Sequence, residues 1–381
     1  MHVLIAADKF KDALSAKKVC EAIEKGIQQG DKEIKTTVFP MADGGNGTAE
    51  ILTMHSKGKK IIHKVHDPLG RIIESSLGLS GDGKTAFIEM AAASGLELLK
   101  PEERRCVDTS TFGTGELIKK AIGLGVSEII MGIGGSATND GGTGMAAALG
   151  YQFKDDAGTL LKPAGKNLLK IKSIDDTNVL PGLKKLKISI ACDVLNSLYG
   201  PNGAAFNYAA QKGATDEEVV MLDNGLKHLA QLIRDFSGLE VKNMPGAGAA
   251  GGLGAGAVAF LGASLEPGIE LVMKQTGFEE ILRQADVVIT GEGKIDKQTL
   301  HGKVVSGIAK LAMKYHIPVI ALGGTIEINE QEQRKAGIAF QTSIQDQKTP
   351  LDQALRQTFE NLVKTGEQII PVLKKLSKNE N

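Results

Sequence analysis

The sequence lacks several features that mark whole classes of protein. It has no tryptophan among its 381 residues, and its three cysteines, Cys20, Cys106 and Cys192, lie far apart. An odd and scattered set of cysteines argues against a disulfide framework and favours a reducing compartment, so we expect a cytoplasmic protein. No apolar run reaches the roughly 18 residues that a membrane-spanning helix needs.

The sequence also lacks an excess of charge. Lysine and arginine total 45, aspartate and glutamate total 45, and the formal net charge is 0. Nothing in this balance favours nucleic acid or a membrane surface as a partner, which leaves a small-molecule substrate. The seven histidines are scattered and no pair has metal-ligand spacing, so we expect no structural zinc. The oligomeric state stays open, and the strand-like start at residues 3–7 carries no targeting signal.

Glycine, in contrast, is abundant, with 47 residues. Its most informative stretch runs from Gly134 to Gly142, after an apolar segment at 129–133 and before small residues at 144–149. This order predicts a strand, a tight loop and a helix, in which the backbone can come close to an anion. We predict phosphate or nucleotide binding by Gly134, Gly135, Ser136, Thr138 and Asn139. A plain glycine-rich turn with a helix N-cap is the alternative.

Short apolar strands are predicted near both ends of the chain, at residues 3–7, 36–39, 286–290 and 317–322. Asp8, Asp43 and Glu292 follow three of them. The carboxyl ends of parallel strands are where ligands bind in open α/β sheets, so these acids become candidates for a site. For Asp8 or Asp43 alone, a helix N-cap is an equally simple reading.

The middle of the chain has a different pattern. Residues 61–66 and 71–77 flank Asp67-Pro68-Leu69-Gly70 and predict an antiparallel hairpin. We therefore predict an α/β fold with two domains. A Rossmann-like parallel-sheet domain comes from residues 1–60 and 283–381, with a polar tail at 377–381. A mixed α/β domain, residues 61–282, is inserted into it.

Two segments imitate nucleotide-binding motifs. Gly78–Thr85 matches the P-loop pattern G-x-x-x-x-G-K-[ST], but strand-forming residues follow where a P-loop needs a helix. The central Gly81-Asp82-Gly83 is typical of a turn, so we predict a hairpin. Gly246–Gly254 resembles a dinucleotide fingerprint, but no good strand precedes it. There we predict close packing or phosphate contact and no NAD.

A further strand is predicted at 188–192. It ends at Asp193, whose neighbours Cys192 and Val194 are apolar, so we expect a partly dry setting for this carboxylate. A turn cap is the alternative role for it. Asn196 and Lys212 follow in polar, glycine-containing loops.

Acidic residues in glycine-rich loops thus recur along the chain, together with lysines. Mg²⁺ binds one or two carboxylates and substrate phosphates, lysines neutralise a transferring phosphoryl group, and an aspartate can accept the proton of the acceptor hydroxyl. No Ser-His-Asp or Cys-His pairing is evident. The set predicts a phosphotransferase with a phosphate site that is not a P-loop.

The same motifs carry a resemblance to a family, the type I glycerate kinases of bacteria, over nearly the whole chain. The matching stretches include Pro40–Gly45, Gly134–Gly142, Cys192–Val194 with Asn196, Gln211–Ala214, Gly246–Gly254 and Thr290–Gly293 with Asp296. The resemblance implies ATP- and Mg²⁺-dependent phosphorylation of D-glycerate, usually to 2-phosphoglycerate, at a site between two α/β domains. The chain departs from the pattern where Asp12 replaces a usual glycine, Ser197 a usual proline, and residues 207–210 an aromatic-Gly-Pro run.

These arguments assign every candidate residue a role. The predicted catalytic residues are Asp193, Asp8 and Lys11, with Asp193 as the base or orienter of the substrate hydroxyl. Phosphate or nucleotide binding is assigned to Gly134, Gly135, Ser136, Thr138, Asn139, Gly291, Glu292 and Gly293, substrate binding to Asn196 and Lys212, and metal binding to Asp43 and Asp296. The alternatives are a kinase that forms 3-phosphoglycerate, a kinase for another short hydroxy acid, and a non-catalytic nucleotide-binding protein.

Overall fold

The computed structural model describes residues 1–300, 302–346 and 349–377, which fall into two compact units. Unit 1 combines Met1–Asp43 with the chain from Gly268 onward, and unit 2 is Gly44–Pro267. The division predicted at 60/61 and 282/283 stays a prediction, and most of the predicted tail lies outside the described residues. No helix in the described part of the chain is long and apolar enough to cross a membrane.

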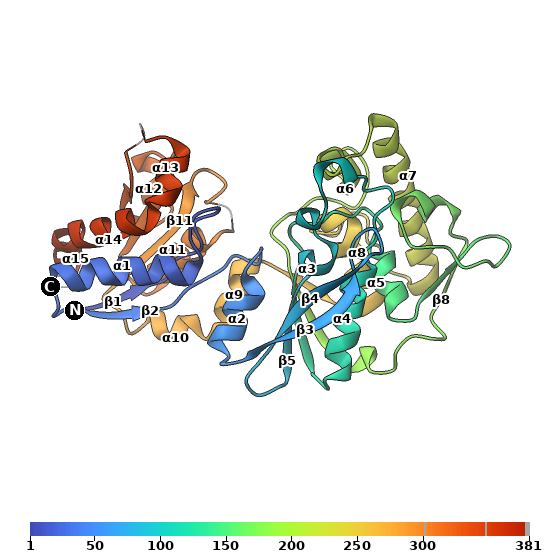
Figure 1. Ribbon diagram of the computed structural model, residues 1–381, viewed down its shortest axis with the longest axis horizontal. Coiled ribbons are helices and arrows are strands. Elements are labelled where there is room, and N and C mark those ends of the chain that lie inside the picture. The colour runs from blue at the N-terminus through green and yellow to red at the C-terminus, as the bar shows by residue number, and fades with distance from the viewer. Residues whose placement is uncertain (301, 347–348, 378–381) are drawn as a thin grey trace. The chain divides into compact units, whose positions relative to one another are not determined.

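Unit 1 is built on a five-stranded sheet with the order β13-β12-β11-β1-β2, in which every neighbouring pair is parallel. The strands are β1 His2–Ile5, β2 Lys35–Val38, β11 Val287–Ile295, β12 Val319–Ile326 and β13 Ile338–Ser343. Figure 1 shows β1 and β2 side by side, with helix α1 along them. The parallel sheet predicted from both ends of the chain is therefore confirmed.

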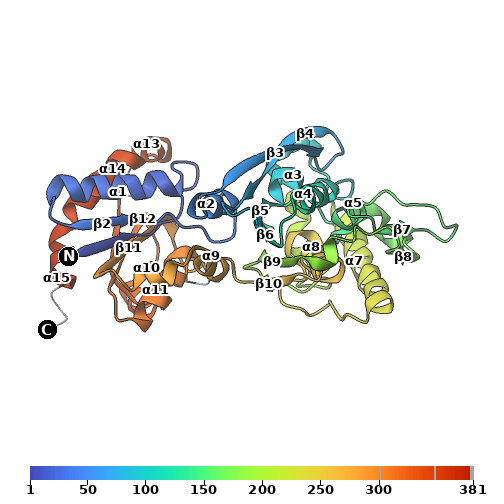
Figure 2. The same cartoon turned by 90° about the horizontal axis from the view of Figure 1, so that it is seen from below.

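Helices cover both faces of this sheet. They are α1 Ala16–Gly30, α9 Gly268–Thr276, α10 Phe278–Leu282, α11 Val304–Lys314, α12 Glu330–Lys335, α13 Leu351–Arg356, α14 Thr358–Gln368 and α15 Ile370–Leu376. Figure 2 shows α1 and α14 on one side of the sheet and α10 and α11 on the other. Helix α1 begins where Ser15 Oγ accepts a hydrogen bond from the Lys18 N–H, and its apolar face packs on Val3, Ile5 and Ile289.

Strand β11 is longer than its sequence predicts. We expected it to end at Thr290, but it continues to Ile295, so Gly291, Glu292 and Gly293 lie in a strand and not in a loop. The reason is close contact with β12, since a Cβ on Gly291 would lie 2.4 Å from the Leu322 carbonyl oxygen. These glycines permit two backbones to approach each other, whereas their local sequence is typical of a turn.

Unit 2 holds a mixed six-stranded sheet with the order β10-β9-β6-β5-β4-β3. Its strands are β3 Lys59–His66, β4 Ile72–Leu79, β5 Thr85–Glu89, β6 Glu128–Gly132, β9 Lys187–Ala191 and β10 Ser264–Glu266, and β7 Gln152–Lys154 pairs separately with β8 Ser173–Asp175. The β3–β4 and β4–β5 pairs are antiparallel and the others are parallel. The predicted hairpin at 61–77 and the mixed character of this part are confirmed.

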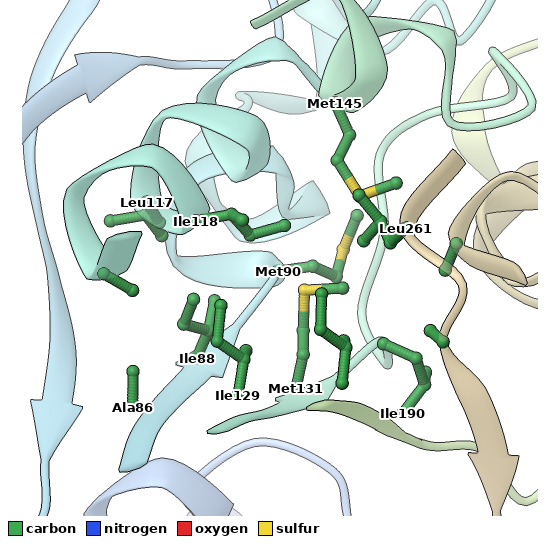
Figure 3. Packing of buried hydrophobic residues seen from close by; sticks show 14 of the residues in the cluster. Ala86, Ile88, Met90, Leu117, Ile118, Ile129, Met131, Met145, Ile190 and Leu261 are labelled. Atoms are coloured by element: carbon green, nitrogen blue, oxygen red, sulfur yellow. The ribbon is translucent and has the colours of Figure 1, made fainter. Parts of the chain in front are cut away.

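The helices of unit 2 enclose the larger core. They are α2 Thr48–His55, α3 Ala91–Ser94, α4 Phe112–Gly123, α5 Thr143–Ala148, α6 Ala204–Tyr208, α7 Asp216–Ser237 and α8 Ala249–Leu261, with short 3-10 turns such as η2 Pro101–Glu103 and η5 Ala210–Lys212. Figure 3 shows Leu117 and Ile118 of α4 facing Ile88 of β5 and Ile129 of β6. This packing fixes β6, and with it the start of the glycine-rich loop.

The segment that imitates a P-loop is a hairpin turn between β4 and β5, as predicted. The Ser80 N–H donates to the Thr85 carbonyl at 2.9 Å, and Asp82 Oδ1 accepts from Ser80 Oγ at 2.6 Å and from the Lys84 N–H at 3.0 Å. The chain then enters β5, so no helix follows Lys84 to bind a phosphate. The side chain of Lys84 is exposed.

We predict that Lys84→Ala leaves nucleotide affinity within about threefold and unfolding free energy within about 0.5 kcal/mol, because exposed turn positions contribute little. Asp82→Ala is the matched control in the same turn. It removes two hydrogen bonds and should lower the unfolding midpoint slightly without changing nucleotide affinity. Equilibrium unfolding and nucleotide titration measure both quantities. A hundredfold loss of nucleotide affinity in Lys84→Ala would contradict the hairpin assignment.

Candidate functional site

The glycine-rich loop of unit 2 joins β6 to α5, in the predicted order of strand, loop and helix. Asp140 holds it together. Its buried Oδ2 accepts from the Thr111 N–H at 2.8 Å, from Thr111 Oγ1 at 2.9 Å and from the Gly144 N–H at 3.1 Å. Burial raises the pKa of Asp140, and these hydrogen bonds oppose the rise. Asp140 is therefore a scaffold residue that ties the loop to the start of α4.

Lys212 is the buried cation of this site, with 3% of its surface exposed. Its Nζ donates to Ser136 Oγ at 2.7 Å and to the Thr138 carbonyl oxygen at 2.8 Å. Burial lowers the pKa of Lys212 to about 8. None of the acidic side chains that the structure describes forms an ion pair with it. A predicted substrate-binding residue is thus joined to two predicted phosphate-binding residues, and its charge favours an anion nearby.

Several buried polar atoms of the loop have no hydrogen-bond partner in the described part of the chain. Thr138 Oγ1 and both Oδ1 and Nδ2 of Asn139 form no hydrogen bond with any described residue, and both residues are fully buried. Leaving a buried donor or acceptor unsatisfied costs about 1–3 kcal/mol, so these atoms indicate bound polar atoms, from water or a ligand. Gly134 and Gly135 are exposed at the start of the loop, and Gly135 has φ +72°.

The other glycine-rich segment supports this loop from behind. Residues 250–252 at the start of α8 have positive φ values. A Cβ on Gly251 would lie 2.1 Å from the Thr138 carbonyl oxygen and 2.6 Å from the Asn139 Cα. Of the two roles predicted for Gly246–Gly254, close packing is the one confirmed.

Asp193 and Asn196 follow β9. Asp193 is exposed, as are Val194 at 36% and Leu195 at 78%, so the expected dry setting was wrong. Cys192 packs against the core of unit 2, whereas Val194 and Leu195 are exposed. Asn196 is engaged inside the loop, since its Nδ2 donates to the Asn202 carbonyl at 3.1 Å and its Oδ1 accepts from the Tyr208 hydroxyl at 2.6 Å.

Unit 1 carries a separate group of acids at the carboxyl ends of its strands. Asp8, 8% exposed, follows β1, Asp43 lies beyond β2, and Glu292, 7% exposed, belongs to β11. Burial, and then the negative charge of Asp43, raise the pKa of Asp8 to about 7. Burial also raises the pKa of Glu292, while the ammonium group of Lys303, 3.3 Å from its Oε2, opposes the rise. Three predicted site residues are thus electrostatically coupled.

This acidic group suits a divalent cation. Glu292 Oε1 and Thr290 Oγ1 are buried without a hydrogen-bond partner among the described residues. Since these two residues are separated by one position in strand β11, their side chains lie on the same face of the strand. Carboxylate oxygens are the protein ligands that Mg²⁺ prefers, so the donors fit this ion. Across the described ranges, no three His, Cys, Asp or Glu side chains already form a metal-binding group.

The other predicted residues of unit 1 lie at the edge of this group. Asp296 Oδ1 accepts from the Gln298 N–H at 2.8 Å and from the Thr299 N–H at 3.2 Å, and Lys294 Nζ lies 3.6 Å from its Oδ2. Partial burial raises the pKa of Asp296, but these hydrogen bonds outweigh it and the pKa is lowered. Lys11 is exposed, and its backbone nitrogen lies 3.3 Å from the Cβ position of Gly293.

Sequence reasoning missed three contributors. Thr290 was treated as the last residue of a strand, yet its hydroxyl is one of the unpaired buried atoms. Asp140 is only one of several acids in glycine-rich loops by its sequence, yet it organises the loop. Arg104 received no role, although its Nε is buried without a hydrogen-bond partner in the described structure. The sequence carries no signal for this role of Arg104, because neither the burial of its Nε nor the lack of a partner can be read from the residue order.

We predict that Gly251→Ala destabilises unit 2 by roughly 1–3 kcal/mol more than Gly262→Ala, because its Cβ would displace the Thr138 backbone. Gly262 is the matched control, since its φ of +64° resembles the +67° of Gly251 but no atom lies within 4 Å of its Cβ position. The difference between the two urea-unfolding midpoints therefore isolates the contact from the backbone strain. Equal midpoints would mean that the contact can relax without cost.

We also predict that Asp8→Asn raises stability in metal-free buffer at pH 8 but only slightly at pH 4.5. The pKa of Asp8 rises from 3.8 to about 7 on folding, so the folded state binds more protons between these values and stability falls as pH rises through them. The gain at pH 8 should be ~2–4 kcal/mol by the linkage relation. Asp296→Asn is the control with a lowered pKa and should bring no gain at pH 8. A pH-independent effect of Asp8→Asn in chemical denaturation would contradict the assigned shift.

Several known proteins are similar to this chain over nearly its whole length. The sequence profile of the glycerate kinase family matches residues 3–374. The chain is 44% identical over 373 residues to glycerate 2-kinase of Escherichia coli K12, with 98% of each chain covered. It is 44% identical over 374 residues to glycerate kinase of Bacillus cereus, again with 98% of each covered. A crystal structure of a candidate glycerate kinase 2 from Salmonella typhimurium LT2 superimposes with a TM-score of 0.90, at 42% identity and 98% coverage of each chain.

Proposed function

The chain belongs to the glycerate kinase family, and on that premise we propose that it transfers the terminal phosphoryl group of ATP to D-glycerate in the presence of Mg²⁺, yielding 2-phosphoglycerate and ADP. The Escherichia coli relative named glycerate 2-kinase supports the choice of product. The buried acids of unit 1 and the buried lysine of unit 2 support phosphoryl transfer, which needs both metal-binding carboxylates and positive charge.

The observation that carries the proposal is the bonding of Lys212 to Ser136 and Thr138. This lysine is buried without an ion-pair partner in the described structure, beside a loop whose Thr138 and Asn139 side chains have unused donors and acceptors. An anionic group bound there would neutralise the lysine and satisfy those atoms. Phosphate oxygens meet both requirements, since they are charged and accept several hydrogen bonds.

In unit 1, Asp43 and Glu292 are the side chains that would hold Mg²⁺, with Asp296 as a further predicted ligand. Bound there, the ion would neutralise negative charge on the phosphates of ATP. Lys303 already approaches Glu292 at 3.3 Å, so this carboxylate is partly neutralised without the ion. Of the predicted ligands, Asp296 is the one most committed to its own turn, through two backbone N–H groups.

Two carboxylates compete for the role of general base. Asp193 is the choice from sequence, but it is exposed. Asp8 is buried, and its pKa of about 7 is suited to accepting a proton near neutral pH. Burial and a pKa near neutrality therefore favour Asp8 as the group that accepts the proton of the reacting hydroxyl, with Asp193 as an orienting residue.

The proposed reaction is tested by incubating the protein with ATP, Mg²⁺ and D-glycerate. ADP release coupled to NMR identification of the product should give 2-phosphoglycerate, and addition of EDTA should abolish turnover. L-glycerate, glycolate and D-lactate serve as competing acceptors in the same assay. Formation of 3-phosphoglycerate, or a higher kcat/KM for another acid, would refute the stated regiochemistry or substrate. ATP binding without turnover of any acid would refute the reaction itself.

We predict that Asp8→Asn lowers kcat by about 10²–10⁴-fold, the usual contribution of a general base, while ATP affinity changes less than threefold. Asp193→Asn is the matched comparison, because it makes the same change on an exposed residue, and it should lower kcat less than tenfold. Steady-state kinetics with both substrates varied, and ATP binding by calorimetry, provide the measurements. The reverse order of the two losses would return the base role to Asp193.

A further inference from the structure

Arg104 of unit 2 is a charged residue that has no ion-pair partner among the described residues. It follows the 3-10 turn η2, is partly buried, and its Nε is shielded from solvent without donating to any group in the described ranges. No described carboxylate forms an ion pair with it. Its neighbours differ, since Arg105 pairs with Glu218 at 3.0 Å and Arg71 pairs with Glu103 at 2.6 Å.

The backbone places Arg104 beside Lys212. A Cβ on Gly213 would lie 1.8 Å from the Arg104 carbonyl oxygen and 3.2 Å from the Arg104 Cβ. Two residues later, the Cys106 N–H donates to the Lys212 carbonyl oxygen at 3.1 Å. The main chain around Arg104 is thus in direct contact with the segment that presents the buried lysine.

The segment that carries Arg104 also contacts the glycine-rich loop, through residues 95 and 96 at its other end. The Leu96 N–H donates to the Gly135 carbonyl oxygen at 2.9 Å, and Gly95 forms an isolated β-bridge with Ser136. Residues 95–106 therefore run from the proposed phosphate loop to the backbone of Lys212. An arginine on this segment belongs to the surroundings of the candidate site and not to a remote surface.

We propose that Arg104 binds the carboxylate of the hydroxy-acid substrate and is a specificity-determining residue of the reaction. This inference rests on the proposed function. A guanidinium group offers donors in a planar fork that matches the two oxygens of a carboxylate, and a buried donor without an acceptor is costly until such a partner arrives. The binding of one anion would provide the missing acceptor.

Lys212 and Arg104 lie on different segments, and this favours a carboxylate over a phosphate as the ligand of Arg104. Lys212 Nζ is bonded to Ser136 and Thr138, so its charge belongs to the loop assigned to phosphate. Arg104 lies on a different segment. The carboxylate of a hydroxy acid does not change during phosphoryl transfer, and fixing it would orient the reacting hydroxyl and reject neutral polyols.

The first test is Arg104→Gln, with kinetics in both substrates. The KM for D-glycerate should rise roughly 10- to 150-fold, the loss expected for a charged hydrogen-bonded contact, while the KM for ATP stays within twofold. Arg104→Lys should recover part of the loss, because it restores charge without the fork. Arg105→Gln is the matched control, since it removes an adjacent arginine whose pairs are on the surface, and it should change neither KM by more than twofold.

The second test uses the wild-type enzyme and so does not depend on the folding of a variant. Phenylglyoxal modifies accessible arginines, and peptide mass spectrometry measures modification at Arg104. Saturating D-glycerate should protect Arg104 at least fivefold, whereas glycerol, which lacks the carboxylate, should not. Protection by ATP and not by D-glycerate would overturn the inference and assign Arg104 to a phosphate. Equal modification under all conditions would overturn it as well.

Different results would refute the proposed reaction and the proposed role of Arg104. A wild-type enzyme that does not phosphorylate D-glycerate would refute the proposed function. An active wild-type enzyme whose Arg104→Gln variant keeps its KM for D-glycerate would overturn only the role of Arg104. A merely structural role would lower kcat/KM for both substrates and reduce stability, without the selective rise in one KM.

Discussion

The candidate site of unit 2 depends on burying one ammonium group that has no carboxylate partner among the described residues. Lys212 donates to Ser136 Oγ and to the Thr138 carbonyl, and burial holds its pKa near 8. Asp140, the buried acid of the same region, is satisfied by Thr111, Gly142 and Gly144, so it attracts the lysine only at a distance. Each charge is held by hydrogen bonds to its surroundings and not by the other. The positive charge therefore remains available to an anion, which a direct Lys–Asp pair would have prevented.

Unit 1 holds uncompensated charge as well, but there the charge is negative. Burial is the main reason that the pKa of Asp8 rises, and repulsion from the negative charges of Asp43 and Glu292 adds to the rise. A cation relieves this repulsion, as does a proton. The cluster thus costs stability in the absence of a partner and gains affinity for a cation or a proton. Sites that bind and transfer charged groups commonly show such uncompensated charge.

Much of the fold could be predicted from sequence because its signals are local. Short apolar strands near both ends of the chain identified the parallel sheet of unit 1, and Gly81-Asp82-Gly83 identified a hairpin where a motif search alone finds a P-loop. The errors arose where the decisive contact is distant in sequence. Gly291 and Gly293 indicate a turn until the backbones of Leu322 and Lys11 are known to lie against them, Leu322 against Gly291 and Lys11 against Gly293. The role of Asp140 depends on Thr111, 29 residues away, and the backbone of Arg104 packs against the distant Gly213. Residue types indicated a phosphotransferase site. They did not indicate which of its acidic residues would act as the general base and which would bind the metal.

The departures from the family pattern show how a loop can keep its shape while its residues change. Asp12, which stands where the resembling family usually has glycine, adopts φ +62°, and aspartate is among the few side chains that tolerate this conformation. Tyr208 lies in the run that replaces an aromatic-Gly-Pro sequence, and its hydroxyl binds Asn196 Oδ1 at 2.6 Å while Asn196 Nδ2 holds the Asn202 carbonyl. The Asn196 amide is therefore occupied on both sides by the protein. It positions the loop after β9, and this leaves the recognition of a substrate anion to cations such as Arg104, whose Nε has no acceptor among the described residues.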